Sequence, residues 1–537
     1  MLSALAIAVF CSATRPSADW PLTRAERSNY DQTSSYDDVI EFVKALQAKG
    51  SPITLTWSGE STEKRKMPLV VVAYPPVTTP GEAKKSGKPV VYVQGNIHAG
   101  EVEGKEAAQM LLRRVCQEIE EIKAGRGKKE FLADKLVLLV NPIYNADGNE
   151  KWAPVERNRP EQVGPKEVGI RANGQGFDLN RDCIKAESPE MRGVLQHVYG
   201  AWDPDMIMDL HTTDGTRHGY DLTYSPALNP NTDAAILKFS RDEMLPFVRK
   251  EVGKKYGYKL FDYGDITTRN GKSTFATFAS EGRYVTNYGG IRNRICVLSE
   301  AVTYIPFKDR VLATEKFVSS VLEYVARNGA RLVKMTKDAD AKVVAWGSNP
   351  GKAPKLGVRF DFDSRGEEEV VYEKPIRPRP FGRPTELMTS KMPIIDRFKV
   401  TRTADFPAGY LVPESNASAV ELMRRHGIKV ERLMIDWDGP AQSFTISEKN
   451  QDASPFQGHR LLRLEGKFSP ANVRVPAGTL LVRTAQPLGL LAFHLLEPEM
   501  TDGLATWGFL GEKLDAGNTY PVLKLMTIPN VPLEALD

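Results

Sequence analysis

A His-x-x-Glu pair directly follows an apolar run in the first fifth of the sequence. The stretch Val90-Val-Tyr-Val-Gln-Gly-Asn-Ile-His98-Ala-Gly-Glu101 is typical of a buried strand that ends just before an amphipathic helix. Imidazole nitrogen and carboxylate oxygen both bind zinc, and catalytic zinc is often held by two His and one Glu with a fourth position open. His98 and Glu101 are therefore candidates for two metal ligands, although such a pair also occurs by chance.

A candidate for the third ligand ends a second apolar run, Met206-Ile-Met-Asp-Leu-His211. Ligands of α/β proteins gather at the carboxyl ends of neighbouring strands, which is where His98 and His211 would both lie. Among the seven His of the chain, His218 is the rival, because it follows the Gly-containing loop after His211. We favour His211, since a strand end holds a ligand more rigidly than a loop does.

A candidate base ends a third apolar run, Arg294-Ile-Cys-Val-Leu-Ser-Glu300. A glutamate beside a metal can take a proton from water and deliver it to a leaving amine. If this strand lies in the same sheet, Glu300 would point from the same edge as His211. The alternative is an exposed carboxylate that caps the following segment.

A candidate substrate anchor lies between the proposed ligands, in Asp178-Leu-Asn180-Arg181. The guanidinium of Arg181 is a planar fork that matches a carboxylate, and Asn180 can add a further hydrogen bond. Asp178 could accept the second N–H of a metal-bound imidazole. The alternative is an Asn-Arg turn stabilised by surface ion pairs.

Residues 36–328 alternate strand-like and helix-like patterns, which predicts an α/β domain with a mixed, largely parallel sheet flanked by helices. The helix patterns are an amphipathic segment with Ala107 and Ile119 on one face, and Lys308–Arg327. The predicted strands are short, apolar and bounded by turn residues: Leu69–Ala73, Val90–Gln94, Leu136–Asn141, Met206–Leu210 and Ile295–Ser299.

The length of 537 residues predicts more than one domain. We expect a first domain over 19–335, a connector over 336–400 that is rich in Pro and Gly, and a β-rich or α+β domain over 401–537. Hydrophobic residues at 41%, charged residues at 26% and a formal net charge of +4 are typical of a soluble globular protein. So small a net charge gives no reason to propose nucleic acid or an anionic membrane surface as a partner.

The first residues, Met1-Leu-Ser-Ala-Leu-Ala-Ile-Ala-Val-Phe, resemble the apolar core of a secretory signal, followed by small residues where cleavage could occur. We expect residues 1–18 to be a signal peptide whose missing positive leader reflects a truncated or misassigned start. The run is too short to span a bilayer, so we expect a secreted or periplasmic protein without an integral membrane segment. Cys116, Cys183 and Cys296 show no metal-binding spacing and are expected to be buried apolar residues.

Taken together and in order, five segments resemble the zinc carboxypeptidase family, the carboxypeptidase A-like metallopeptidases. They are His98-Ala-Gly-Glu101, Asn145-Ala-Asp-Gly148, Asp178-Leu-Asn180-Arg181, Asp209-Leu-His211 and Leu298-Ser-Glu300. The resemblance covers residues 40–328 and implies a zinc carboxypeptidase-like fold. It also implies one Zn²⁺ ion held by His98, Glu101 and His211, with Glu300 as the general base.

The same resemblance assigns the remaining site residues. Asn180 and Arg181 correspond to the anchors of the substrate's C-terminal carboxylate, and Asp178 to the partner of the first zinc His. The arginine that polarises the scissile carbonyl corresponds to Arg157 or Arg159, of which we favour Arg159. The tyrosine that covers the substrate corresponds to Tyr288 or Tyr284, and Tyr288 is taken here.

The expected function is that of a zinc metallocarboxypeptidase acting on protein or peptidoglycan-derived peptides with a free C-terminal carboxylate. One alternative is an aspartoacylase-like amidohydrolase of N-acyl amino acids, which would use the same ligands and anchor. The other is a non-catalytic protein that binds peptide or glycan, which would predict loss of a ligand or of the base. The C-terminal domain carries no recognisable chemical motif.

Overall fold

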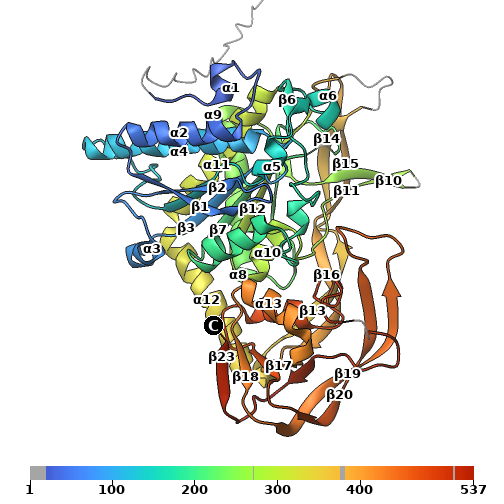
Figure 1. Cartoon of the computed structure of the whole chain (residues 1–537). Helices are drawn as coiled ribbons and strands as arrows, with labels where there is room; N and C mark the ends of the chain where they lie inside the picture. The colour runs from blue at the N-terminus through green and yellow to red at the C-terminus, as the bar shows by residue number, and fades with distance from the viewer. Residues whose placement is uncertain (1–19, 214, 270, 375–380, 512–513, 537) are drawn as a thin grey trace, which may run out of the picture.

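The computed structural model describes residues 20–536, apart from 214, 270, 375–380 and 512–513. An eight-stranded sheet and its helices form the upper part of the molecule in Figure 1, and a sheet built from the end of the chain forms the lower part. The expected signal peptide, residues 1–18, lies outside the described residues. No helix among the described residues has the length and apolar character needed to cross a membrane.

The eight-stranded sheet has the order β1-β2-β4-β3-β7-β12-β8-β9. Strand β3 is parallel to β4 and β7, and β12 is parallel to β7. Strand β2 pairs antiparallel with β1 and β4, and β8 pairs antiparallel with β12 but parallel with the edge strand β9. This confirms the predicted mixed sheet with a parallel centre. Its strands are β1 (Ile53–Glu60), β2 (Lys66–Val72), β3 (Val90–Gly95), β4 (Val137–Asn141), β7 (Met206–Thr213), β8 (Leu222–Pro226), β9 (Leu260–Asp262) and β12 (Ile295–Val302).

Helices cover both faces of this sheet because its central strands are apolar on both sides. One face packs against α2 (Tyr36–Ala48), α4 (Glu103–Lys123), α9 (Leu245–Tyr256), α11 (Phe307–Arg327) and α12 (Gly329–Ser348). The other face packs against α7 (Pro189–Val194) and α10 (Val285–Ile291). Shorter helices connect these elements: α1 (Arg24–Arg27), α3 (Pro80–Ser86), α5 (Ala146–Asn149), α6 (Val155–Asn158) and α8 (Ala234–Leu237).

Two glycines allow helix α4 to start directly against the sheet. A Cβ on Gly95, the last residue of β3, would lie 2.8 Å from the carbonyl carbon of Gly104, and a Cβ on Gly104 would lie 2.7 Å from the Leu210 Cβ. Both positions therefore favour a residue without a side chain. The close approach brings the turn after β3, which carries His98 and Glu101, next to β7.

The described residues of region 336–400 differ from the predicted connector, because most of them form a helix and strands. Helix α12 runs to Ser348, and the strands that follow are β13 (Lys355–Asp363), β14 (Glu367–Glu373) and β15 (Leu387–Ile395), with β16 (Arg397–Asp405) beyond. The Pro-rich stretch that suggested a connector stands between β14 and β15 in the sequence, and its residues 375–380 lie outside the described residues. The flanking segments find hydrogen-bonding partners, since β15 pairs with β14 and with β11 (Lys272–Ala276), the partner of β10 (Asp265–Arg269).

The C-terminal sheet, defined here as β17 to β23, has seven strands in the order β20-β19-β22-β17-β21-β18-β23. Its strands pair antiparallel, as expected for a β-rich region. They are β17 (Gly409–Val412), β18 (Val430–Leu433), β19 (Trp437–Gln451), β20 (Leu462–Val475), β21 (Leu480–Arg483), β22 (Leu523–Leu525) and β23 (Leu533–Leu536), with helices α13 (Ala417–Arg425) and α14 (Gly489–Leu496).

The hydrophobic core of the C-terminal sheet is continuous with that of the eight-stranded sheet. One cluster of buried residues includes Tyr92 and Ile207 of the eight-stranded sheet together with Tyr410 and Leu491 of the C-terminal region. The three described cysteines, Cys116, Cys183 and Cys296, are buried free thiols, as the sequence predicted. The two parts of the molecule therefore share packing and are not joined by a linker alone.

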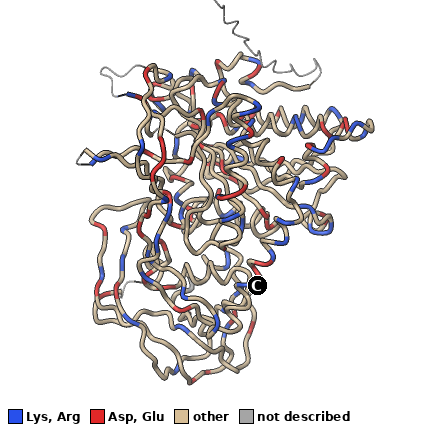
Figure 2. Tube along the Cα trace, turned by 180° about the vertical axis from the view of Figure 1, so that it is seen from behind, with Lys and Arg blue, Asp and Glu red and all other residues tan. Residues whose placement is uncertain are grey.

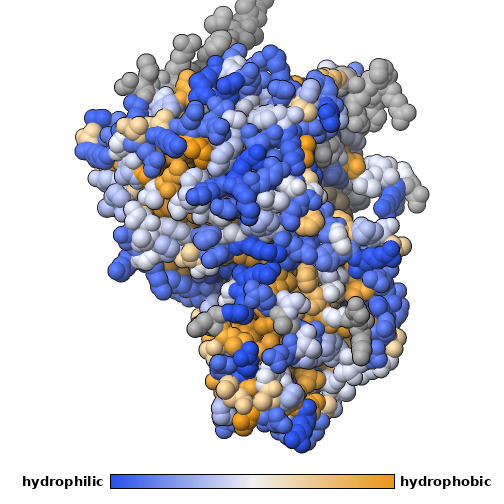
Figure 3. All heavy atoms as spheres, in the orientation of Figure 1, coloured by the Kyte–Doolittle hydropathy of each residue, from blue (hydrophilic) through white to orange (hydrophobic). Residues whose placement is uncertain are grey.

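The surface carries charges of both signs. Lys and Arg are interspersed with Asp and Glu over the back of the molecule (Figure 2). In the space-filling view of the front, apolar residues are most visible on the lower part, over the C-terminal sheet (Figure 3). The exposed large apolar side chains include Met434 and Ile435 beside β18.

Candidate active site

The turn after β3 is fixed by side-chain hydrogen bonds of asparagines. Asn96 has a φ of +66° and donates from Nδ2 to the carbonyls of Ala99 and Glu101, at 3.2 Å each. Asn145 donates to the Ile97 carbonyl at 3.3 Å. An Asn is one of the few side chains that tolerates a left-handed backbone, so this turn can place His98 and Glu101 immediately at the end of β3.

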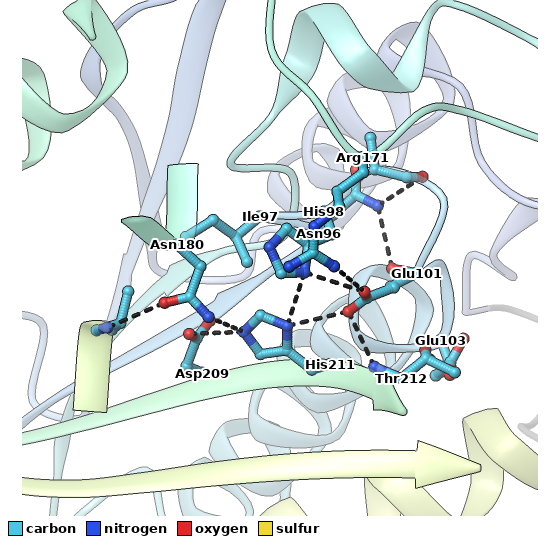
Figure 4. A network of polar contacts seen from close by, with 12 residues as sticks. Asn96, Ile97, His98, Glu101, Glu103, Arg171, Asn180, Asp209, His211 and Thr212 are labelled. Atoms are coloured by element: carbon cyan, nitrogen blue, oxygen red, sulfur yellow. Dashed lines mark hydrogen bonds and ion pairs between the residues drawn. The ribbon is translucent and has the colours of Figure 1, made fainter. Parts of the chain in front are cut away.

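His98, Glu101 and His211 meet at one point, as Figure 4 shows. Glu101 lies between the two rings, with Oε1 at 3.0 Å from His98 Nδ1 and Oε2 at 3.0 Å from His211 Nδ1. The two Nδ1 atoms are 3.2 Å apart. All three side chains are buried, and one ligand atom from each lies within 4.8 Å of the others.

The outer nitrogens of both rings contact carboxylates. His98 Nε2 lies 2.9 Å from Asp178 Oδ1, and His211 Nε2 lies 2.7 Å from Asp209 Oδ2. In the neutral tautomer that these carboxylates favour, Nε2 carries the hydrogen and Nδ1 presents a lone pair. Two lone pairs and a carboxylate then face one another, which is a donor set that a divalent cation such as zinc fits.

Asp209 was not predicted as a site residue, although the sequence contains a signal for it. In Asp209-Leu-His211, the aspartate and the histidine are two positions apart on one strand, so their side chains share a face. His218, the rival ligand, lies elsewhere. It is buried against Tyr304, whose hydroxyl is 2.8 Å from its Nδ1.

Glu300 lies beside His211 because β12 and β7 are parallel neighbours and pair these two residues in register. Burial raises the pKa of the Glu300 carboxyl well above its ordinary value; His211 opposes this and Glu101 adds to it. A cation bound next to it would favour the ionised form again. The position suits a carboxylate that accepts and releases a proton.

A cavity of about 180 Å³ opens in front of these groups. It brings together the predicted ligands, Glu300, Asn180 and Arg181, and adds residues that the sequence analysis did not assign. Its lining consists of His98, Glu101, Arg171, Asn180, Arg181, His211, Thr212, Thr213, Tyr263, Phe278, Tyr284, Thr286, Leu298 and Glu300.

Asn180 and Arg181 are positioned by hydrogen bonds and by a contact with an aromatic ring. The backbone N–H of Val285 donates to Asn180 Oδ1 at 3.0 Å, and the Asn180 backbone N–H donates to Asp178 Oδ1 at 2.9 Å. The Arg181 guanidinium carbon lies 4.5 Å from the centre of the Tyr284 ring, which places the cation over the aromatic face. Helix α10 and the segment before it therefore support the proposed substrate anchor.

Asp178 contacts two cationic or potentially cationic groups. Besides His98, it accepts a hydrogen bond from Arg171 Nε to Oδ2 at 2.9 Å. Although burial alone would raise it, these neighbours hold the pKa of the Asp178 carboxyl well below its ordinary value. Asp178 is therefore an ionised acceptor behind His98.

Two of the predicted site residues, Tyr288 and Arg159, are not among the residues that line the cavity. Tyr288, expected to cover the substrate, is fully buried on α10, and its hydroxyl lies 2.7 Å from Nδ1 of His426. Tyr284 and Tyr263 line the cavity instead. Tyr288 points into the core because α10 turns its side chain toward the C-terminal region, a direction that sequence alone does not reveal.

Arg159, expected to polarise the carbonyl, lies beneath the site and not on its surface. It is 6% exposed, with Nη1 at 3.3 Å from Glu101 Oε1 and Nη2 donating to the Thr212 carbonyl at 3.3 Å. The arginine that lines the cavity is Arg171, whose Nη1 also lies 3.3 Å from Glu101 Oε1. Arg171 follows an irregular loop, which left no periodic signal for it in the sequence.

Comparisons with known proteins agree with this geometry. Residues 39–274 match the family model of the zinc carboxypeptidases. Carboxypeptidase 2 of Trichophyton equinum is 24% identical over 516 residues, covering 91% of this chain and 86% of the relative. Carboxypeptidase 2 of Trichophyton rubrum is 23% identical over 514 residues, with the same coverage of both chains. The similarity thus extends into the C-terminal region.

Two solved structures are also similar. A metallo-carboxypeptidase from Burkholderia cenocepacia has a TM-score of 0.41 at 15% identity, covering 55% of this chain and 70% of that chain. A metallo-carboxypeptidase from Pseudomonas aeruginosa has a TM-score of 0.39 at 18% identity, covering 56% and 70%. The match over residues 39–274, together with the buried His-Glu-His set that those residues contain, identifies this part of the chain as a zinc carboxypeptidase domain and the protein as a metallocarboxypeptidase.

Proposed function

We propose that this enzyme removes the last residue of peptides that end in a free carboxylate, using one zinc ion held by His98, Glu101 and His211. The observation that carries this proposal is the composition of one cavity of about 180 Å³. It is lined by the three candidate ligands, the candidate base Glu300, and the Asn180-Arg181 pair. A metal site, a base and a carboxylate anchor in one cavity are the parts that an exopeptidase of this class needs.

The first step is recognition of the substrate's carboxylate. Arg181 can donate two parallel hydrogen bonds to it, and its stacking on Tyr284 fixes the plane of the guanidinium. Asn180 lies beside it and adds an amide donor. Binding by the terminal carboxylate places the last peptide bond next to Glu300 and the histidines, which confers selectivity for chain ends.

The second step is hydrolysis. Bound zinc would act as a Lewis acid that polarises the carbonyl and acidifies water. Glu300 accepts the proton of the attacking water and delivers it to the leaving amine nitrogen. Arg171, which lines the cavity beside Glu101, is placed to donate to the oxygen that becomes negative in the tetrahedral intermediate.

The proposal is tested with a peptide of free C-terminus, the same peptide amidated, and a set of N-acyl amino acids. We expect cleavage of the free peptide only. Arg181→Met should raise KM for this peptide by roughly 10- to 100-fold, because a hydrogen-bonded charge pair is lost, while kcat changes less. Equal cleavage of both peptides would contradict the carboxylate anchor. Preference for N-acyl amino acids would favour the aspartoacylase-like alternative, and zinc-free inactive protein would favour the non-catalytic one.

The role of Arg171 is separable from that of Arg181. Arg171→Met is expected to lower kcat by about 10²-fold or more, the effect of removing one donor to the oxyanion, with a small change in KM. The comparison is with Arg181→Met, which should raise KM and change kcat less. If Arg171→Met changed only KM, the oxyanion role would be wrong and Arg171 would be a second substrate anchor.

A further inference from the structure

The loop that joins β19 and β20, residues 452–461, reaches from the C-terminal sheet to the candidate active site. At its tip, Phe456 and His459 exchange backbone hydrogen bonds of 2.7 and 3.0 Å. The two residues between them have positive φ angles, +49° at Gln457 and +84° at Gly458. This is the pattern of a two-residue type I′ turn, a conformation that fixes the direction of its central side chains.

Gln457 uses this turn to contact the segment that carries the substrate anchor. Its Oε1 accepts a hydrogen bond from the backbone N–H of Asp178 at 3.0 Å. Asp178 is the residue whose carboxylate faces His98 Nε2 and accepts the backbone N–H of Asn180. One hydrogen bond thus joins the C-terminal sheet to the residue behind a candidate metal ligand.

A second contact of the loop lies at the other end of the same segment. His459 Nε2 is 2.9 and 3.0 Å from the two carboxylate oxygens of Glu187. Glu187 also binds Lys185 Nζ at 3.0 Å, and Lys185 binds Asp182 at 2.9 Å. The chain from Asp178 to Glu187, which contains Asn180 and Arg181, is therefore held by the loop near both ends.

The loop is in turn packed against a buried aromatic and ionic cluster. Trp507 lies 6.2 Å from the Phe456 ring in a stacked arrangement and donates to Asp502 at 2.8 Å. The Arg283 guanidinium lies over both rings, at 5.2 Å from Phe456 and 4.9 Å from Trp507, and pairs with Asp502 at 3.0 Å. Arg283 precedes Tyr284, the ring on which Arg181 rests.

We infer that the 452–461 loop positions the substrate-anchoring segment, and that Gln457 is a positioning residue acting through Asp178. The C-terminal sheet then affects two properties of the site: the affinity for the metal, through His98, and the affinity for the substrate's carboxylate, through Asn180 and Arg181. The second effect rests on the proposed function; the first depends only on the metal.

The experiment compares Gln457→Met with Gln457→Glu and Gln451→Met. Gln457→Met keeps the length of the side chain and removes the acceptor, whereas Gln457→Glu keeps an acceptor at the same distance. Gln451→Met makes the same exchange at an exposed position on the same hairpin. Zinc affinity is measured by competition with a chelator. KM and kcat are measured with the peptide that has a free C-terminus, and the Tm is measured on metal-free protein.

Gln457→Met should weaken zinc binding and raise KM by about 3- to 10-fold each, as expected for one net hydrogen bond, with kcat within about twofold. Gln457→Glu should recover most of both losses. Asp178→Asn alone should weaken zinc binding by about 10- to 100-fold. Adding Gln457→Met to this variant should then weaken zinc binding little further.

The inference would be overturned if Gln457→Met had the same zinc affinity and KM as Gln451→Met. It would also be overturned if the losses of zinc affinity caused by Gln457→Met and Asp178→Asn were fully additive in the double variant. If Gln457→Met lowers the Tm more than Gln451→Met does, Gln457→Glu decides: failure to recover zinc affinity rejects a positioning role. If the wild type binds zinc but cleaves no peptide, the proposed function fails, and the zinc measurements still decide the inference.

Discussion

Replacing Glu300 with Gln is expected to abolish peptide hydrolysis while leaving the zinc content unchanged. The amide fills the same space between His211 and the cavity but cannot accept the proton of water. Loss of a general base typically costs 10²- to 10⁴-fold, so kcat should fall by about that factor and KM should change little. Steady-state kinetics with the free peptide, together with metal analysis of the same sample, measures both quantities.

The control for this prediction is Glu41→Gln, the same exchange at an exposed position on α2. It should retain wild-type activity and zinc. A Glu300→Gln enzyme with unimpaired turnover would refute the assigned base, whatever its metal content. An enzyme that also loses zinc would show that Glu300 supports the metal in addition to, or in place of, moving a proton.

Replacing His211 with Ala is expected to remove both zinc and activity. The remaining pair, His98 and Glu101, would leave the metal with two protein ligands, and catalytic zinc in proteins is held by three. We expect zinc to fall from about one ion per chain to near zero after dialysis against a weak chelator. Elemental analysis measures this, and turnover should drop to background in the same preparation.

His218→Ala is the matched control, because His218 is the next histidine along the chain after His211 and is also buried. It should lower the Tm, since its contact with Tyr304 is lost, but keep zinc and activity. If His218→Ala lost zinc and His211→Ala retained it, the assignment of the third ligand would be wrong.

The sequence determined the parts of the site that depend on local order. Each apolar run that was predicted as a strand forms one, and the polar residues at the ends of β3, β7 and β12 meet because parallel neighbours end at the same edge of a sheet. Asp178 was predicted to accept a hydrogen bond from a metal-bound imidazole, and its Oδ1 lies 2.9 Å from His98 Nε2. Local pattern was sufficient there because each residue sits at a fixed distance from a regular element.

The tertiary structure decided what depends on the direction of a side chain or on contacts between distant segments. Tyr288 and Tyr284 are one helical turn apart, yet one is in the core and the other in the cavity. Arg159 and Arg171 are both near Glu101, and only packing distinguishes the buried arginine from the one that lines the cavity. Gln457 reaches Asp178 across 279 positions of sequence, and no local pattern records that contact. Such contacts form only once the two sheets share a core, which is why sequence alone left the role of the C-terminal region open.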